Sequence, residues 1–198
     1  MKSGFTTVCL AFASATMLSM QPALAQSSQI VFAVSGSNTC VYTGSSGFSA
    51  YPELVLSATP NVRTSYLKGQ LTFDLTGTGT YSVSQLQIYA DGTNLAVGKS
   101  PVIENSVTCN VAYQSQSDGT YKIELKNCIA NLTAGASIGT TTMTSTITLD
   151  AVLSPSGEIV KLTHVSPTVE SGTFTPTTGT TSSFTRICGR NLTGVRIP

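Results

Sequence analysis

Apolar and polar residues alternate with a period of two along much of this chain. Between residues 69 and 76 the apolar side chains occupy every second position, and the same spacing recurs at 120–128 and 142–153. Side chains alternate between the two faces of a β-strand, whereas an amphipathic helix needs apolar residues every three or four positions. No stretch of the sequence has the helical spacing. The chain is therefore expected to be all-β.

Short turns separate the expected strands. Asp91-Gly92 and Asp118-Gly119 are typical of hairpins, because glycine accepts a positive φ and aspartate tolerates one. Ser154-Pro155-Ser156-Gly157 fits a four-residue turn. The pattern predicts strands over residues 29–34, 38–43, 52–58, 69–76, 80–90, 94–98, 106–114, 120–128, 142–153, 158–165 and 182–189.

Sequential strands joined by short turns favour an antiparallel meander. No segment between them is long and helical enough to connect parallel strands. Such a meander closes as an up-and-down barrel, and the alternative is a two-sheet β-sandwich.

The first 25 residues have the layout of a cleaved secretory signal peptide. Lys2 precedes an uncharged, mostly apolar run at 8–20, and Ala23-x-Ala25 offers small residues for cleavage. The run is too short to span a bilayer, which takes about 20 residues, and the chain is expected to have no transmembrane segment. Residues 26–198 are then a single all-β domain of 173 residues (198 less 25), secreted or periplasmic, with a place at the cell surface also open.

The mature domain keeps four of the five cysteines, because Cys9 belongs to the leader. An even number of cysteines in an exported chain predicts two disulfides. Structural zinc sites usually contain closely spaced ligand pairs, and no C-x-x-C occurs here, so no metal is expected.

Hairpin register favours one of the three connectivities. A two-residue turn at Asp118-Gly119 places Cys109 opposite Cys128, but it also puts apolar and charged residues on one face. A bulge near Lys126-Asn127 with a one-residue longer turn resolves that conflict. The second bridge is then Cys40–Cys188, which fits a barrel whose first and last strands are neighbours. Sequence alone leaves the other two connectivities open.

Residues 171–183 are rich in threonine and uncharged, and they are interpreted as an exposed loop or irregular edge strand; an O-glycosylated or adhesive segment is the other interpretation.

Asn131 and Asn191 begin glycosylation sequons, and whether they are used depends on the source.

The one serine-hydrolase motif lacks its structural context. Ser137 lies in a G-x-S-x-G pattern, with Asp150 and His164 following in the hydrolase order. A nucleophile elbow needs a helix after the serine, whereas a β-branched run follows here. His164 shares a strand face with apolar residues, which indicates a structural histidine. The chain is therefore expected to be non-enzymatic, with no cofactor and no catalytic residues.

The charge balance excludes one class of partner, and two aromatic residues are candidates for contact with another. Removal of Lys2 leaves nine basic and nine acidic residues, which gives no electrostatic footprint for nucleic acid. Phe48 and Tyr51 lie in a glycine-rich segment and are the candidate contacts for a ligand or partner. The expected function is a structural, interaction or adhesion module, and the alternative is a barrel that binds a small apolar ligand. The expected partner of this chain is thus an unidentified protein, glycan or small apolar ligand.

Overall fold

The computed structural model describes residues 29–42, 61–89, 102–134, 138–164 and 166–198. Strands and turns account for these ranges, which contain no helix. The strands are β1 (Gln29–Tyr42), β2 (Asn61–Asp74), β3 (Thr78–Tyr89), β4 (Val102–Ser115), β5 (Tyr121–Ala134), β6 (Gly139–Met143), β7 (Ile147–Leu153), β8 (Ile159–Thr163), β9 (Thr168–Pro176) and β10 (Ser182–Ile197). The expectation of an all-β chain is confirmed.

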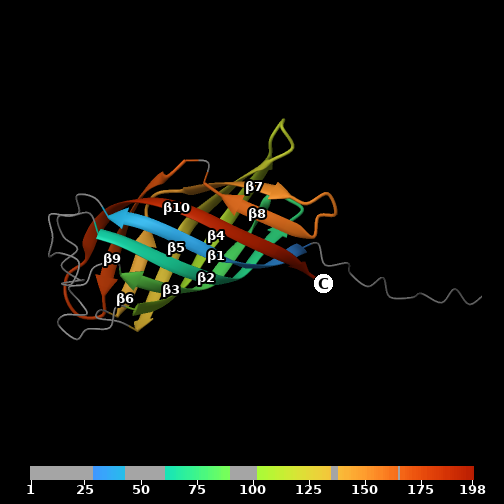
Figure 1. Cartoon of the computed structure of the whole chain (residues 1–198). Helices are drawn as coiled ribbons and strands as arrows, with labels where there is room; N and C mark the ends of the chain where they lie inside the picture. The colour runs from blue at the N-terminus through green and yellow to red at the C-terminus, as the bar shows by residue number, and fades with distance from the viewer. Residues whose placement is uncertain (1–28, 43–60, 90–101, 135–137, 165) are drawn as a thin grey trace, which may run out of the picture.

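The strands form a closed antiparallel ring (Figure 1). Strands β1 to β5 pair in sequence order, and β10 returns to pair with β1 over Val31–Tyr42. Strands β6 and β7 both pair with β5, and β8 and β9 both pair with β10, so each couple occupies one position in the ring. Ten strands thus fill eight positions of an up-and-down barrel, and the β1–β10 pairing excludes the open sandwich.

The strand expected at 142–153 is interrupted between β6 and β7. Ser145 and Ser171 exchange hydrogen bonds there: the Ser171 amide donates to the Ser145 hydroxyl (2.9 Å), and the Thr144 and Ser145 amides donate to the Ser171 carbonyl. A serine side chain that bonds nearby backbone offers an alternative to the regular ladder. The bend therefore follows from Ser145, which the alternating pattern does not distinguish from a strand residue.

One end of the barrel is formed by three tight turns at residues 75–77, 116–120 and 154–158, and it is called the hairpin end below. Strand β10 finishes at this end, on the right in Figure 1. Gly77, Gly119 and Gly157 take positive φ values of 89°, 82° and 72°, as the turns require. Two of these glycines lie in turns expected from the sequence.

The β4–β5 hairpin has the bulge that the cysteine positions predicted. The turn pairs Ser115 with Tyr121, and the register shifts beyond Lys126, where Asn127 has φ 52°. Asparagine is one of the few non-glycine residues that adopt this conformation readily. The shift returns Cys128 to the inner face, where it meets Cys109.

Two disulfides join neighbouring strands. The sulfur atoms of Cys40 and Cys188 are 2.03 Å apart and link β1 to β10, the pair that closes the ring. Those of Cys109 and Cys128 are 2.05 Å apart and link β4 to β5. These are the two pairings that the sequence analysis favours.

The threonine-rich segment is not a loop along its whole length. Residues 171–176 lie in β9 (168–176), which pairs with β6 on one side and β10 on the other, and residues 182–183 lie in β10, so the expected loop or edge strand is wrong for most of the segment. Threonine is β-branched and fits a strand that alternates inward and outward. Buried Glu170, Gly172 and Phe174 give β9 its inward face.

The break expected between 34 and 38 is also absent, because β1 is continuous. Its Gly36 serves close packing: a Cβ atom there would lie 2.2 Å from the Asn191 carbonyl of β10. Glycine at this position permits neighbouring backbone to approach rather than starting a turn.

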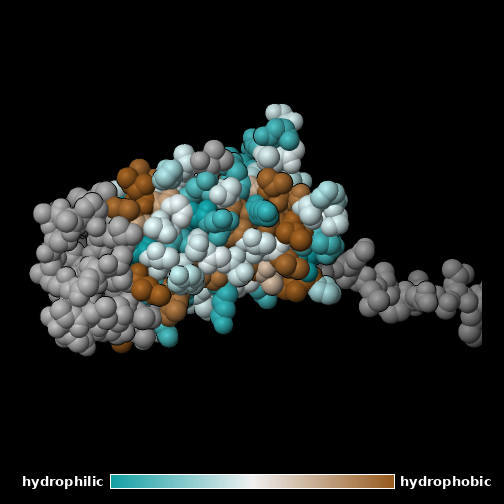
Figure 2. Space-filling model, viewed as in Figure 1, coloured by the Kyte–Doolittle hydropathy of each residue, from teal (hydrophilic) through white to brown (hydrophobic). Residues whose placement is uncertain are grey.

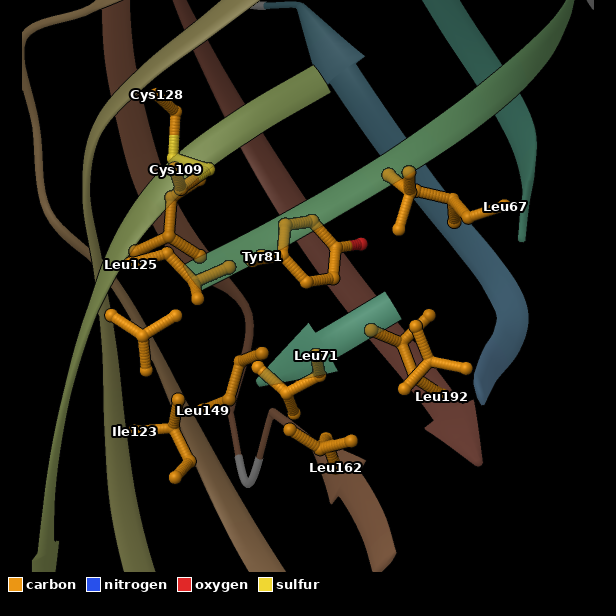
Figure 3. Packing of buried hydrophobic residues seen from close by; sticks show 14 of the residues in the cluster. Leu67, Leu71, Tyr81, Cys109, Ile123, Leu125, Cys128, Leu149, Leu162 and Leu192 are labelled. Carbon is orange, nitrogen blue, oxygen red and sulfur yellow. A yellow bond between two sulfur atoms is a disulfide. The ribbon is translucent and has the colours of Figure 1, made fainter. Parts of the chain in front are cut away.

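The barrel is filled by inward-facing side chains from every wall. Figure 3 shows Tyr81 among leucines and isoleucines that point into the ring from several strands. The largest fully buried apolar side chains are Phe32, Leu71, Ile123, Leu125, Leu149, Val160, Leu162, Phe174 and Leu192.

Opening the two disulfides separately should destabilise the barrel unequally. The bridges close loops with sequence separations of 148 and 19 residues. The chain-entropy model gives about 5 kcal/mol for the long loop and about 3 kcal/mol for the short one. Urea unfolding of the Cys40→Ala/Cys188→Ala and Cys109→Ala/Cys128→Ala double variants measures both losses. A larger loss for the Cys109–Cys128 pair would contradict this ranking.

Candidate functional site

The structure does not test the aromatic residues singled out from the sequence. Phe48 and Tyr51 lie outside the described residues, as does Ser137 of the hydrolase motif. The described part of the chain contains a buried charged cluster inside the barrel and an apolar pocket at the hairpin end, besides a wide open groove of about 610 Å³ bordered by Lys68 and Glu104.

The half of the barrel interior away from the hairpin end contains polar side chains among apolar ones such as Leu132 and Phe184. Its buried polar side chains are Asn38, Arg63, Ser65, Gln85, Gln87, Asn105, Glu170, Ser182 and Arg190. About 50 Å³ of free space remains in this part of the interior, bounded by several of these polar residues and by apolar ones such as Leu125 and Phe184, and it suffices for ordered water. Tyr81 reaches this space, and burial raises the pKa of its hydroxyl to about 12 despite the nearby Arg190 charge.

Glu170 is the centre of the charged cluster. Its side chain is fully buried, and both carboxylate oxygens are bound by Arg190 of β10 in a bidentate pair. Arg186, directly opposite Glu170 in the β9–β10 register, donates from Nε at 2.9 Å. A buried carboxylate needs such partners, because transfer of an unpaired charge out of water is very unfavourable.

Burial alone would raise the pKa of Glu170, but the Arg190 and Arg186 charges and their hydrogen bonds outweigh it and lower the pKa from 4.5 to about 2. The sulfur atoms of Cys40 and Cys188 lie within 4.8 Å of this carboxylate. Because these sulfurs are bonded to each other, they do not offer thiolates to a metal. The cluster is therefore a structural element rather than a metal centre.

His164 is held by backbone and hydroxyl groups. Its Nδ1 lies 2.9 Å from the Cys188 carbonyl, and its Nε2 lies 3.4 Å from the Thr168 hydroxyl. Burial, aided by the Arg190 charge, lowers the pKa of its imidazole. A general base needs a nucleophile within about 2.6–3.2 Å; Nδ1 faces a backbone carbonyl, and the Thr168 hydroxyl is farther from Nε2 than that range. Gly139, at the end of the G-x-S-x-G pattern, opens strand β6 and not a helix.

A pocket of about 210 Å³ opens into the barrel at the hairpin end. Its walls carry four aromatic side chains, Phe32, Phe73, Tyr113 and Tyr121, from four different strands. The Phe73 ring makes edge contacts with Phe32 (6.0 Å between centroids) and Tyr113 (4.9 Å). These T-shaped contacts favour one arrangement of the rings and hold the aromatic wall together.

Turn chemistry fixes the aromatic wall to the backbone. The Tyr113 hydroxyl donates to the Asp74 carbonyl, and the Tyr113 amide donates to the Gly77 carbonyl at 2.9 Å. The Asp74 carboxylate accepts hydrogen bonds from Thr76 and Thr78, and those bonds hold its pKa well below the usual range. The β2–β3 turn therefore positions the Tyr113 ring.

The pocket has volume because small residues face its large ones. Ala151 lies opposite Tyr121 in the β5–β7 register, and Gly157 closes the adjacent turn. Beneath them Ile123 and Val160 form an apolar floor at 1% exposure each.

Arg196 is the one charged residue among the described residues that line the pocket. It is paired with Phe32 in the β1–β10 register, and its amide donates to the Glu158 carbonyl at 2.8 Å. Its guanidinium lies 3.9 Å from a Glu158 carboxylate oxygen, with the two side chains 44% and 57% exposed. An exposed pair at this distance contributes little to stability, so Arg196 is available at the rim.

The outer wall also carries apolar residues near this end. Val195 of β10 pairs with Ile159 of β8 and with Ala33 of β1, and all three side chains are exposed. Figure 2 shows hydrophobic residues gathered toward both ends of the visible face, with hydrophilic and neutral residues between them.

No protein-family model matches the sequence, and no curated protein matches it. Among solved structures, the secretin InvG of the Salmonella SPI-1 type III secretion injectisome in the open-gate state, residues 176 to the end, is similar at 10% identity. That match covers 85% of this chain and 59% of the InvG chain, with a TM-score of 0.26. A resemblance at that level carries no argument about this protein.

In the described residues, no helix has the length and apolar character needed to cross a membrane.

The sequence analysis did not predict the pocket. Phe73, Tyr113 and Tyr121 lie in strand-like contexts and read as core residues, and Arg196 carries no motif. Their common feature is position: each is an inward residue near the end of its strand, at the same end of the barrel. That signal becomes visible only when the strand order and the hairpin turns are considered together.

Replacement of Glu170 by glutamine should remove an acid-dependent part of the stability. A folded-state pKa of about 2 against an ordinary value of 4.5 stabilises the fold fully above pH 4.5, and the contribution disappears as the pH falls toward 2. This difference corresponds to about 3 kcal/mol at pH 7. Urea unfolding of the wild type and Glu170→Gln between pH 7 and pH 2 measures it.

The two stability curves should converge at low pH, because protonated Glu170 resembles glutamine. A constant gap between wild type and variant across this range would contradict the ionised state of Glu170. The exposed Glu158→Gln variant is the control and should follow the wild type.

Proposed function

We propose that this protein is a non-enzymatic exported binding module whose hairpin end accepts a small apolar group. The observation that carries the proposal is the pocket of about 210 Å³ lined by Phe32, Phe73, Tyr113 and Tyr121. Ligand sites are typically concave, mostly apolar and equipped with few polar groups. The pocket has that composition, with Arg196 as its charged member.

The size of the pocket limits what it can accept. Ligand sites for drug-sized molecules have volumes of roughly 300–1,000 Å³, whereas a cavity of about 150 Å³ accepts benzene. A pocket of about 210 Å³ therefore fits one aromatic ring with a few further carbons. The central interior adds little room, because only about 50 Å³ remains there.

The state of the reactive groups supports a non-enzymatic role. Glu170 is bound by two arginines, His164 Nδ1 is engaged by the Cys188 carbonyl, and His164 Nε2 makes only a long contact of 3.4 Å with the Thr168 hydroxyl. The cysteines Cys40, Cys109, Cys128 and Cys188 are joined in disulfides. Labelling of Ser137 by a serine-directed active-site probe would contradict this part of the proposal.

Export is proposed from the leader at residues 1–25 and from the disulfides, which persist in oxidising compartments. Intact mass spectrometry of the protein purified from a secreting host should give a chain that begins at Gln26. Reduction should raise the mass by four hydrogens, for two disulfides. A mass that retains residues 1–25 would overturn the export proposal.

Filling the mouth of the pocket should abolish binding of a neutral aromatic probe. Leu153 lines the pocket, whereas the next residue toward the N-terminus, Val152, faces outward and is 53% exposed. Leu153→Trp should therefore reduce the affinity for benzyl alcohol at least tenfold, and Val152→Trp should leave it unchanged. NMR titration measures the affinities and should locate the shifts at Phe73, Tyr113 and Tyr121.

Equal affinities in the two tryptophan variants would place the probe outside the pocket and contradict the proposal. Absence of binding to the wild type at millimolar concentrations would do the same. Urea unfolding of each variant checks that the barrel remains folded.

A further inference from the structure

The charge at the pocket rim points to a ligand class. Ten of the eleven described lining residues are apolar, aromatic or glycine, and the eleventh is Arg196. We infer that the pocket binds a small aryl or short branched-chain carboxylate, with its apolar part against the aromatic wall and its carboxylate on the Arg196 guanidinium. This inference rests on the proposed function, since it identifies the ligand of the same pocket.

Arginine suits this role better than a simple positive charge would. Its planar guanidinium presents parallel N–H donors that match the two oxygens of a carboxylate. Arg196 lies at the last inward position of β10, opposite Phe32 of β1, so the guanidinium is at the mouth while the apolar floor lies deeper. A ligand with an apolar body and one terminal anion matches this arrangement, because its body can reach the apolar floor while its anion stays at the guanidinium.

The present partner of Arg196 is loosely held. The closest approach to Glu158 is 3.9 Å, longer than a hydrogen bond, and the Glu158 carboxylate is 57% exposed in a turn. A ligand carboxylate can replace Glu158 without leaving a buried charge unpaired, because Glu158 is hydrated in either state. The contrast is Arg190, whose bidentate partner Glu170 is fully buried.

Nearby acidic groups limit the affinity and must be considered. Glu158 is the carboxylate next to Arg196, and ionised Asp74 lies at the β2–β3 turn of the same end. The Asp74 carboxylate is engaged by Thr76 and Thr78, so Glu158 is the direct competitor for the guanidinium. Removal of the Glu158 charge should therefore tighten the binding of an anion.

Three probes of nearly equal shape separate charge from apolar contact: 3-phenylpropionate, 3-phenylpropanol and 3-phenylpropylamine. Wild-type protein should bind the carboxylate about three- to fivefold more tightly than the alcohol, the range for a half-exposed ion pair, and the amine least. Isothermal titration calorimetry and NMR at low salt measure the three affinities.

Arg196→Gln should abolish the preference for the carboxylate, so that the carboxylate and the alcohol bind the variant equally. Binding of the alcohol then shows that the variant retains the pocket. Glu158→Gln should strengthen carboxylate binding about twofold, because the competing charge is removed. The matched control is Lys161→Gln: Lys161 is an exposed cation on β8 that pairs with the outward Val152 and is not in the pocket lining.

The outcomes distinguish this inference from the proposed function. Equal affinity for the three probes, or a carboxylate preference that survives in Arg196→Gln, would overturn the carboxylate assignment while the apolar pocket stands. An equal effect of Lys161→Gln would overturn it too, since general electrostatics would then explain the preference. Failure of all three probes to bind would overturn the proposed function as well.

Discussion

The pairing of β1 with β10 is the constraint on which the rest of the molecule depends. It runs from Val31 to Tyr42 along the first strand and leaves neither terminal strand with an open edge. Ring closure gives the sheet an inside and an outside, so alternate residues on every strand have opposite environments. The Cys40–Cys188 disulfide lies within this pairing and covalently joins the first strand to the last.

The interior of the closed barrel differs in polarity between its two halves. Near the hairpin end the inward residues are mostly aliphatic and aromatic, and Leu71, Ile123 and Leu162 pack there at 1% exposure or less. In the other half the inward positions also hold amides and arginines, including the two arginines that bind Glu170. A buried charge of this kind is favourable only while its partners remain in place. The cluster is thus suited to specifying the β9–β10 register, in which Arg186 lies directly opposite Glu170.

Local sequence rules predicted the parts of the fold that depend on local geometry. The turn at Asp118-Gly119, the bulge at Asn127 and the pairing of Cys109 with Cys128 all follow from residues within one hairpin. Strand β9 was not predicted, because its threonine-rich segment has no strong hydrophobic alternation and its burial depends on β6 and β10.

The candidate site could not be predicted from the sequence either, because its residues are far apart along the chain. Residues such as Tyr113 and Arg196 are 83 positions apart in the sequence (196 less 113), and only the closed ring brings both to one opening. A single-sequence pattern identifies the face on which a residue lies but not the end of the barrel that it reaches. The aromatic pair Phe48 and Tyr51 was chosen from loop composition, a criterion that overlooks sites built from strand ends.

The position of the pocket on strand ends has a consequence for recognition. Its aromatic wall is attached to paired strands and to the Asp74 turn, whose hydrogen bonds connect it to Tyr113. Side chains held in this way lose little conformational freedom when a ligand binds, so even a few apolar contacts yield measurable affinity. The same rigidity limits adaptation, because Ile123 and Val160 are fixed by the core beneath. Selectivity should therefore follow size and the terminal charge of the ligand, and a bulkier apolar body should be excluded rather than accommodated.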